Sequence, residues 1–497
     1  MTLSDHLPVL QVIVPLLAAP LVILLRNGFL AWLATLLTSL CALGLGSQLT
    51  ATVLAHGPQH YHVGGWAPPF GISLSVDAFS ALLVLLISGA SCLALAGGRL
   101  SLRRDIDNRR APMFYGAWLI AVAGLSGIAV AGDAFNVFVF MEISSLATYI
   151  LIAGGRDRRA LSAVFKYLII GTIGATFYLI GVGFIYMMTG TLNFADMAVR
   201  LEGVIETRPV VIAAGFITIG LALKAAIFPL HVWLPRAYTY APNAVTVFIA
   251  ACSTKVALYV LLRFNFAVFH GNLLGHSELF SAFVIPLALS GILIASLVAV
   301  YQTNLKKLLA FSSVAQVGYI ALAAGLTSAS GLLAAMLHMF NHALAKGSLF
   351  LCVAAFALVS GDTSLKRLQG IGRRMPWTMG AFVIAGLSLI GVPGTAGFIS
   401  KWYLIVAALE FGQVGFLLVA AIVVSSLMAV AYLWHFVEGA YYGTPPAGES
   451  GPMEVSLPLR CLIWVAALSN IFFGLFPQLP LALARSGTSA LLQGGLY

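Results

Sequence analysis

The stretch Ile219–Asn243 reads IGLALKAAIFPLHVWLPRAYTYAPN and places charged and helix-breaking residues inside an apolar run. Lys224 costs at least about 2.5–3.5 kcal/mol to insert at the bilayer centre, so it needs a partner, a water-filled cavity or a function that keeps it there. Pro229 lacks a backbone donor and clashes with the preceding turn, so a helix should break just beyond Lys224. Broken helices occur at membrane depth only where they line protein or water. We therefore expect an ion path here.

The composition of the 497-residue chain indicates a membrane protein. Hydrophobic residues make up 61% and charged residues only 8%, whereas about a quarter of the residues of soluble proteins are charged. The apolar runs are long and unalternating, as expected of helices that need about 20 residues to cross a bilayer, and unlike the strands of a membrane β-barrel. The sequence predicts an all-α polytopic membrane protein.

Charge and cysteine usage exclude several other classes. The net charge of +10 comes from basic residues in short loops, where they act as topology signals, so no nucleic-acid partner is expected. The N-terminus, MTLSDHLPVL, lacks a basic leader and a cleavage site, so the first apolar run should be a retained span. The cysteines lie inside apolar runs without paired spacing, which argues against disulfides and zinc or iron–sulfur sites; they are Cys41, Cys92, Cys252, Cys352 and Cys461.

About fourteen spans are expected. They cover residues 8–26, 28–54, 72–97, 113–131, 134–153, 162–188, 210–239 (broken), 243–269, 279–301, 307–326, 330–359, 377–409 (broken), 412–438 and 457–476. Alternate loops carry clusters of basic residues: Arg99, Arg103, Arg104, Arg109 and Arg110; Arg156, Arg158 and Arg159; Lys306 and Lys307; Lys366, Arg367, Arg373 and Arg374. By the positive-inside rule these loops are cytoplasmic, and both termini are predicted outside.

Two broken spans, one at Pro229 and one at Pro393, indicate an internal inverted repeat of five spans, as in many transporters. This pairing sets Lys166 opposite His338. The predicted division of the chain is residues 1–112 for spans 1–3, 113–270 for the first repeat (spans 4–8), 271–440 for the second repeat (spans 9–13), and 441–497 for a loop, span 14 and a C-terminal tail.

Glu142 lies in the middle of AFNVFVFMEISSLATYIL, near the depth expected of Lys224. A carboxylate and an ammonium at matching depth stabilise each other's charged forms. Lys255, in ACSTKVALYVLL, is a second ammonium deep in a span, and two lysines without two acids allow one to be neutral and to pass a proton. The alternatives are an ion pair that only fixes helix packing, and a Lys255 that reaches an interface.

His338, His342 and Lys346 are spaced i, i+4, i+8 and so share one helical face. Histidine titrates nearest neutrality, which makes the stripe a candidate proton relay. The alternatives are a metal pair, for which no carboxylate or cysteine lies near in sequence, and core histidines that only hold hydrogen bonds. We therefore expect no metal site.

Lys401 follows the Gly-Pro-Gly break at residues 391–397 and completes the candidate set. Lys166 is a secondary candidate that could equally reach the basic loop beside it. The proton-translocation candidates are Glu142, Lys224, Lys255, His338, His342, Lys346 and Lys401; the secondary candidates are Lys166, His231, Ser312 and Gln316.

At these residues the sequence resembles the antiporter-like subunits shared by respiratory complex I, membrane-bound hydrogenases and Mrp-type cation/proton antiporters. The resemblance covers essentially the whole chain and is strongest to the D-type subunits of Mrp antiporters, in length, in MTGTLNFADM and in the lysine of the twelfth span. It is carried by FMEISSLATYIL, LKAAIFPLHVWLP, STKVALYV, NLKKLLAFSSVAQVGY, HMFNHALAKGSLF and GVPGTAGFISKWYL.

The resemblance implies two inverted repeats, each with a half-channel, and proton translocation within a larger complex. The residues matching Glu142 and Lys224 form the pair of the first half-channel, and the one matching Lys255 links it to the centre. The histidines and Lys401 serve the other half. Arg236 departs from the family, whose members commonly have an acidic residue after WLP.

We therefore expect the proton-translocating subunit of a multisubunit cation (Na⁺)/proton antiporter, a transporter subunit rather than a redox enzyme. The resemblance also implies a multi-pass protein of the inner (cytoplasmic) membrane of a prokaryote. Its partners would be other membrane subunits, protons, Na⁺ and the lipid bilayer. No quinone, flavin or nucleotide motif is present, so no cofactor is expected. The alternatives are a proton-pumping subunit of a hydrogenase or complex I-like oxidoreductase, a single-chain carrier of an organic solute, and a mainly structural subunit.

Overall fold

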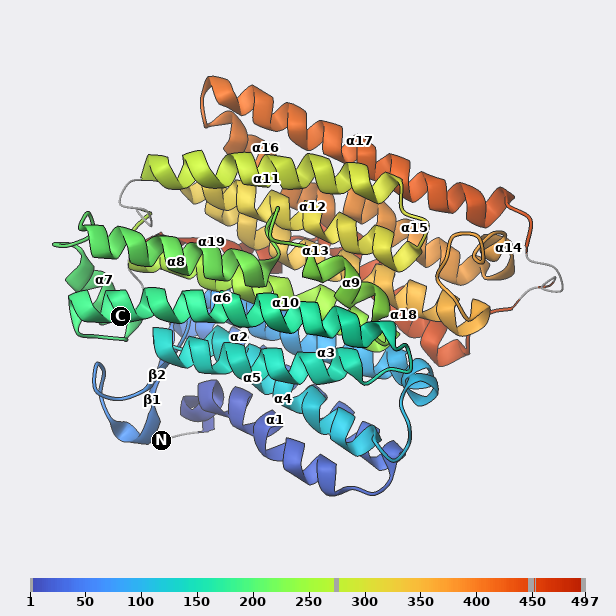
Figure 1. The fold of residues 1–497 in the computed structure, drawn as a ribbon, viewed down its shortest axis with the longest axis horizontal. Helices are drawn as coiled ribbons and strands as arrows, with labels where there is room; N and C mark the ends of the chain where they lie inside the picture. Colours follow the sequence, from blue (N-terminus) through green and yellow to red (C-terminus); the bar gives the residue numbers. More distant parts are fainter. Residues whose placement is uncertain (1–2, 272–276, 446–450, 452, 493–497) are drawn as a thin grey trace.

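A computed structural model describes residues 3–271, 277–445, 451 and 453–492, which form long helices running side by side (Figure 1). Within these residues, thirteen helices are long and apolar enough to cross a membrane. A pair of shorter apolar helices, Pro376–Ile390 and Ala396–Leu409, adds one further crossing. The prediction of an all-α membrane fold with about fourteen spans is confirmed.

The helices and strands follow one another in a simple order. The first part contains α1 (Leu7–Leu24), α2 (Gly28–His56), β1 (Gln59–His62), β2 (Ser73–Val76), α3 (Ala78–Asp105), α4 (Ala111–Val130), α5 (Ala134–Ala153), α6 (Arg159–Thr189), α7 (Phe194–Leu201), α8 (Arg208–Ala225), α9 (Trp233–Tyr240) and α10 (Asn243–Arg263). The second contains α11 (Ser277–Val300), α12 (Leu305–Gly325), α13 (Ala329–Ser360), α14 (Ile371–Arg374), α15 (Pro376–Ile390), α16 (Ala396–Leu409), α17 (Gln413–Tyr442), α18 (Leu457–Leu475) and α19 (Gln478–Leu492).

The third span begins later than predicted. Residues 73–76, which we assigned to this span, form β2 and pair antiparallel with β1. Their sequence, SLSV, alternates polar and apolar residues, which favours a strand over a helix. Asp77 then starts α3 by accepting a hydrogen bond from the Ser80 backbone nitrogen at 2.8 Å, the usual role of aspartate before a helix.

Both predicted breaks are present. In the first, α8 ends at Ala225, Ala226 has a left-handed backbone (φ 59°), and α9 begins at Trp233. In the second, Gly391 has a left-handed backbone (φ 92°) and α16 begins at Ala396. Gly397 makes this second break possible, because a Cβ there would lie 1.8 Å from the Ser388 carbonyl oxygen.

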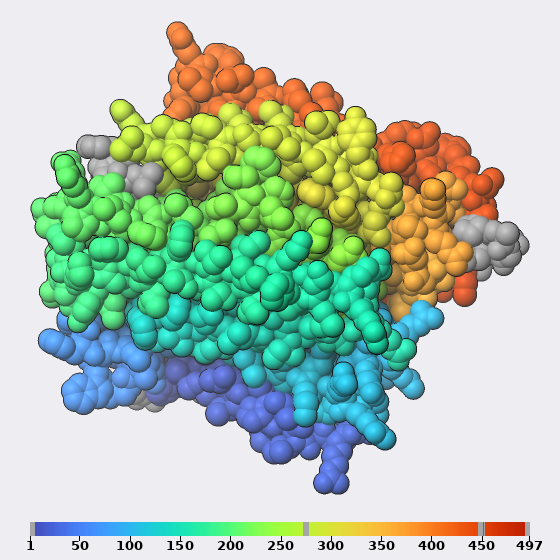
Figure 2. Space-filling view, viewed as in Figure 1, coloured from blue at the N-terminus to red at the C-terminus, as the bar shows by residue number. Residues whose placement is uncertain are grey.

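The two five-span units use the same helix pairs. α4 packs on α5 as α11 packs on α12, α5 on α6 as α12 on α13, and α4 on α10 as α11 on α17. The broken helices correspond as well, since α8 and α9 pack on α6 while α15 and α16 pack on α13. In the space-filling view, the green helices of the first unit meet the yellow-green α11 of the second along one face (Figure 2).

The segment expected to be a C-terminal tail is partly helical. α19 continues beyond α18 and packs against α3 and α13. At the junction, a Cβ on Gly474 would lie 2.4 Å from the Thr395 carbonyl carbon, so α18 touches the break of the twelfth span. Sequence periodicity did not separate this short helix from a tail, because its apolar residues stop well short of a full span.

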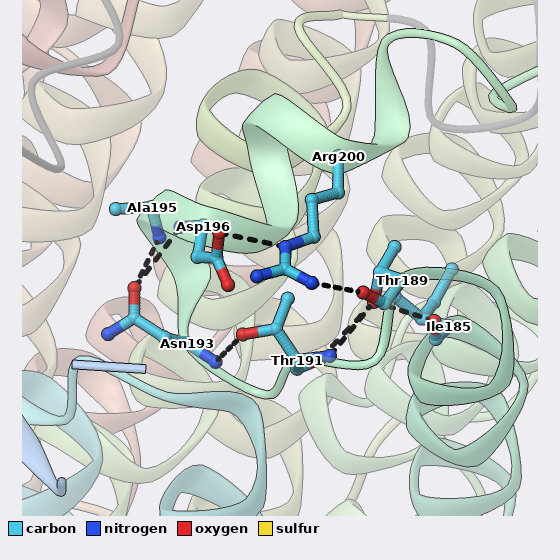
Figure 3. A network of polar contacts seen from close by, with 7 residues as sticks. All are labelled: Ile185, Thr189, Thr191, Asn193, Ala195, Asp196 and Arg200. Atoms are coloured by element: carbon cyan, nitrogen blue, oxygen red, sulfur yellow. Dashed lines mark hydrogen bonds and ion pairs between the residues drawn. The ribbon is translucent and has the colours of Figure 1, made fainter. Parts of the chain in front are cut away.

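The segment after the sixth span folds as a compact cap. Asn193 starts α7 by accepting hydrogen bonds from the Ala195 and Asp196 backbone nitrogens at 3.1 and 3.2 Å (Figure 3). Arg200 bonds back to Asp196 at 2.9 Å and to the Thr189 carbonyl at 3.0 Å (Figure 3). These contacts hold the connection between α6 and α8 in one shape.

The loops that follow α3, α5, α11 and α13 all lie at the right-hand end of the bundle, with α14 (Figure 1). These loops carry the basic clusters, so we refer to this as the basic end. The amino-terminal end of α1 and the cap formed by α7 lie at the opposite end (Figure 1).

We predict that Gly397→Ala destabilises the protein by at least about 1–3 kcal/mol, the usual cost of overpacking. Thermal unfolding of the assembled complex should show a lower melting temperature. Gly215→Ala is the matched control, because no atom lies within 4 Å of a Cβ at that position. Equal melting temperatures for the two variants would contradict this account of the break.

Candidate functional site

Glu142 and Lys224 form an ion pair between α5 and α8. The Lys224 Nζ lies 3.3 Å from the Glu142 Oε1 and donates to the Ser145 Oγ at 2.8 Å. The Lys224 side chain is 5% exposed and that of Glu142 28%. Lys224 lies in the last turn of α8, where the negative end of the helix dipole favours a cation. The end of α8 at the first break thus helps to hold the lysine.

α6 and α8 cross closely beside this pair. A Cβ on Gly220 would lie 2.5 Å from the Gly174 carbonyl oxygen, and one on Gly174 would lie 3.5 Å from the Lys224 Cγ. The two backbones are therefore in direct contact, an arrangement that small residues allow in membrane helices. The crossing covers one side of the Lys224 stem.

A cavity of about 30 Å³ lies between Lys224 and α10. Its polar lining includes Ser145, Thr148, Tyr167 and Ser253. A water needs roughly 10–15 Å³ of such space and two or more polar partners. The cavity therefore has room for one or two waters linking Lys224 to α10.

Lys255 lies on α10 where the two five-span units meet. The side chain is fully buried, and its Nζ donates to the Ala250 carbonyl at 2.5 Å. α10 packs on α13, and Lys255 lies within electrostatic range of His338, His342 and Lys346 on that helix. Lys255 is thus placed between the pair on α5 and α8 and the stripe on α13.

The stripe on α13 lies on one buried face, as predicted. His338 Nδ1 contacts the Ser400 Oγ at 2.9 Å and His338 Nε2 donates to the Gln316 Oε1 at 2.8 Å. The rings of His338 and His342 lie 6.3 Å apart and nearly parallel. Neither ring nitrogen of His342 has a hydrogen-bond partner within the described part of the chain.

Two lysines extend this group in different directions. Lys346 Nζ donates to the Leu309 carbonyl at 2.8 Å and to the Ser312 Oγ, both on α12. Lys401 Nζ donates to the Ile390 carbonyl at 2.8 Å and the Ser426 Oγ at 2.9 Å. Ile390 is the last residue of α15, so its carbonyl has no partner within that helix. Lys401 on α16 therefore ties the two halves of the broken span together.

The structure brings together most of the predicted residues. Ser312 and Gln316 contact Lys346 and His338, as described above. Lys166 is exposed on α6 and does not line the buried group. His231 lies in the first break, stacked on Phe228 with ring centroids 5.2 Å apart. Pro229 and Pro393 lie exposed in the two breaks, and Arg236 is exposed on α9.

Sequence reasoning missed several hydroxyl groups around these residues. Ser145 and Ser426 accept from Lys224 and Lys401, Ser400 contacts His338, and Ser253 lines the cavity beside Lys224. Ser145 lies one helical turn after Glu142, and Ser400 directly precedes Lys401. Their proximity to charged residues inside apolar runs was a usable signal. Ser253, two residues before Lys255, carried the same signal. Ser426 gave none, because its contact with Lys401 comes from the packing of α17 against α16.

A second buried ion pair was also missed. Arg263 Nη2 lies 2.6 Å from the Asp77 Oδ2, and both side chains are 2% exposed. Ser80 accepts from the same guanidinium at 3.1 Å, and the Tyr259 hydroxyl donates to the Ala129 carbonyl at 2.8 Å. This cluster joins the start of α3 to the end of α10.

Among the described residues, no three His, Cys, Asp or Glu converge as metal ligands.

The sequence profile of the NADH:quinone oxidoreductase/Mrp antiporter transmembrane family matches residues 131–429. The chain is 41% identical to NADH-quinone oxidoreductase subunit N of Desulforudis audaxviator, covering 96% of this chain and 97% of that protein. It is 30% identical to the D subunit of the Na(+)/H(+) antiporter of Alkalihalophilus pseudofirmus, covering 94% and 93%.

Two solved structures share the fold over nearly the full length. A chain of an archaeal membrane-bound sulfane sulfur reductase superposes with a TM-score of 0.90 at 30% identity, covering 99% of this chain and 98% of that one. A chain of the Mrp complex from Dietzia sp. DQ12-45-1b gives a TM-score of 0.90 at 27% identity, covering 100% and 99%. Both neighbours belong to membrane complexes.

We predict that Asp77→Ala lowers stability by about 3–5 kcal/mol, because it leaves the Arg263 guanidinium buried without its counter-charge. Adding Arg263→Met should recover most of the loss, measured as the melting temperature of the assembled complex. Asp157→Ala is the control. Asp157 pairs with Arg159 at the surface, where the Arg159 hydrogen bond lowers the pKa of the Asp157 carboxyl, and such a pair contributes at most about 1 kcal/mol.

Proposed function

This chain belongs to the NADH:quinone oxidoreductase/Mrp antiporter family, and on that premise we propose that it is the proton-translocating subunit of a multisubunit cation (Na⁺)/proton antiporter. The observation that carries the proposal is a row of ionisable groups, all buried except the half-buried Glu142, that reaches through both five-span units. The row contains Glu142, Lys224, Lys255, His338, His342, Lys346 and Lys401.

Protons would enter and leave through one half-channel in each unit. In the first unit, the Lys224 ammonium would lose a proton toward Lys255 on α10 through the small cavity beside Ser145 and Ser253, which has room for water. In the second unit, the proton passes from His342 to His338 and on to Lys401. The other route in this unit runs through Lys346. The imidazole of His338 is held by Gln316 and Ser400 in a fixed orientation, which suits proton transfer.

Electrostatic repulsion would couple successive transfers. A proton on Lys255 disfavours a second positive charge on the nearby His338, His342 and Lys346, so each site responds to the state of the next. The Glu142 carboxylate favours the charged form of Lys224. Transfer to Lys255 therefore requires that the Lys224 pair loosen, which gives the first half-channel a switch.

The proposed topology places the basic end in the cytoplasm and both termini outside. It is supported by the basic loops, which all lie at one end of the bundle (Figure 1). Glu202 and Glu206 lie in the connection after α7, at the opposite end. Partners are proposed to be other membrane subunits, because the relatives are named as subunits.

The second candidate is a proton-pumping subunit of a complex I-like or membrane-bound redox complex. It is favoured by the 41% identity to an NADH-quinone oxidoreductase subunit N. The proton path would be the same, and redox chemistry would belong to partner subunits. What differs is the driving force, so a test must identify the partners.

We predict that Lys224→Ala or Glu142→Ala abolishes cation/proton exchange, because each change leaves a charge in the membrane without its partner. Exchange would be measured by the quenching of a pH-sensitive dye in everted vesicles after Na⁺ addition, with assembly checked by co-purification of the other subunits. Lys166→Ala is the matched control, since this lysine is exposed on α6. Full exchange by assembled Lys224→Ala complex would refute the relay.

The partner proteins should separate the two candidates. Affinity purification of the full chain from native membranes is expected to recover only membrane subunits if the complex is an antiporter. Recovery of an iron–sulfur or flavin protein, together with proton pumping driven by an electron donor and not by Na⁺, would replace the first candidate with the second.

A further inference from the structure

A cavity of about 600 Å³ opens at the basic end, between the starts of α2 and α4 and the end of α3. No residue of the proposed proton path lines it. Its walls carry Asn27 and Asn108 beside an unusual group of charges: Arg99, Arg103 and Arg156, with Asp107 as the one carboxylate. The charged side chains of this lining therefore carry a net charge of +2.

Arg99 is held in a fixed orientation by aromatic rings. Its guanidinium carbon lies 4.9 Å from the ring centroid of Phe29 and 4.5 Å from that of Trp32, and the two rings are stacked 5.8 Å apart. Trp32 is fixed in turn, because its indole nitrogen donates to the Leu95 carbonyl at 3.0 Å. A guanidinium held against aromatic faces presents its N–H groups as a rigid fork, which matches the oxygens of a phosphate.

A second cavity, of about 390 Å³, continues from the first and shares Trp32 and Arg99 with it. It runs between α2, α3 and the start of α18 and is lined mainly by apolar side chains: Leu36, Ala96, Leu100, Leu459 and Leu462. Gly97 forms part of its floor. Ala96 and Leu100 are exposed, so the groove opens on the outer surface of the helix bundle.

We propose that the two cavities form a binding site for an anionic phospholipid. The phosphate lies between Arg99, Arg103 and Arg156, and an acyl chain follows the apolar groove toward Leu462. Helices α2, α3 and α4 begin or end here, so the arginines lie at headgroup depth. Basic pockets between membrane helices on the positively charged side favour anionic headgroups. A free phosphate ion would satisfy the arginines but would leave the groove unexplained.

A lipid bound here would join parts of the chain that are far apart in sequence. The ends of α2, α3 and α4 supply the charged pocket, and α18, which follows the second five-span unit, supplies one wall of the groove. None of the ionisable groups of the proposed proton path lines either cavity, so a lipid bound here leaves those groups in place.

The experiment measures phosphatidylglycerol binding to the assembled, delipidated complex by native mass spectrometry, with phosphatidylcholine as the neutral comparison. The double variant Arg99→Gln/Arg103→Gln should weaken phosphatidylglycerol binding by roughly thirtyfold, at about fivefold for each basic residue near the headgroups. Arg109→Gln/Arg110→Gln is the matched control, because it removes the same charge from the adjoining loop and neither residue lines the cavity. Equal binding by the two double variants would overturn the proposal.

A groove variant distinguishes lipid from free phosphate. Ala96→Phe places a ring where the acyl chain is expected, so it should weaken phosphatidylglycerol binding while all three arginines remain. Inorganic phosphate at millimolar concentration should displace little of the lipid from the wild-type complex. Unchanged lipid binding in Ala96→Phe, together with full displacement by phosphate, would make this an ion site and refute the lipid. Unchanged proton exchange in both arginine variants is expected and would keep this test separate from that of the proton path.

Discussion

The structure depends on how positive charge is accommodated in hydrocarbon. Each buried lysine in the row of ionisable groups has a hydrogen-bond acceptor. Lys224 donates to a carboxylate and a hydroxyl, Lys255 to a carbonyl, and Lys346 and Lys401 each to a carbonyl and a hydroxyl. Carbonyl groups inside an intact helix are already bonded within that helix, so Lys255 and Lys346 share theirs. The second broken span supplies Lys401 with the Ile390 carbonyl, since a helix that ends inside the membrane exposes its last carbonyls. Lys224 bonds instead to Glu142 and Ser145, while the Ala222 and Leu223 carbonyls at the end of α8 accept from Ile227 and Trp233.

The need to accommodate positive charge also explains why the two five-span units share their helix packing but hold their lysines differently. In the first unit, Lys224 lies in the last turn of the half-helix α8 and pairs with the Glu142 carboxylate on α5. In the second, Lys401 comes from the half-helix after the break and bonds back to the end of α15. Both solutions place an ammonium at a helix C-terminus, where the dipole favours it. The shared element is the position of the charge, and the chain reaches it from opposite sides of the break.

Local sequence signals predicted much of this arrangement. Lys224, Glu142 and the two prolines stood out because charges and helix breakers are rare in apolar runs, and the spacing of His338, His342 and Lys346 placed them on one face. The signals failed where structure depends on tertiary partners. The ion pair of Arg263 with Asp77 has no local signal, because the two residues are far apart in sequence. The helix expected at residues 73–76 is a strand, because these residues pair with β1. Lys166, a secondary candidate, is exposed on α6, whereas its neighbour Tyr167 is buried and stacks on Trp233.

The glycine crossing of α6 and α8 has a consequence for proton leakage. With the backbones of Gly174 and Gly220 in contact, no file of water fits between α6 and α8 at this crossing, and the cavity beside Lys224 is lined by α4, α5, α10 and Tyr167 instead. In the proposed relay, this close packing would prevent protons from leaking between α6 and α8 past Lys224. A transporter that stores energy as an ion gradient depends on such a seal as much as on its relay, because a leak of protons would dissipate the gradient without any coupled work.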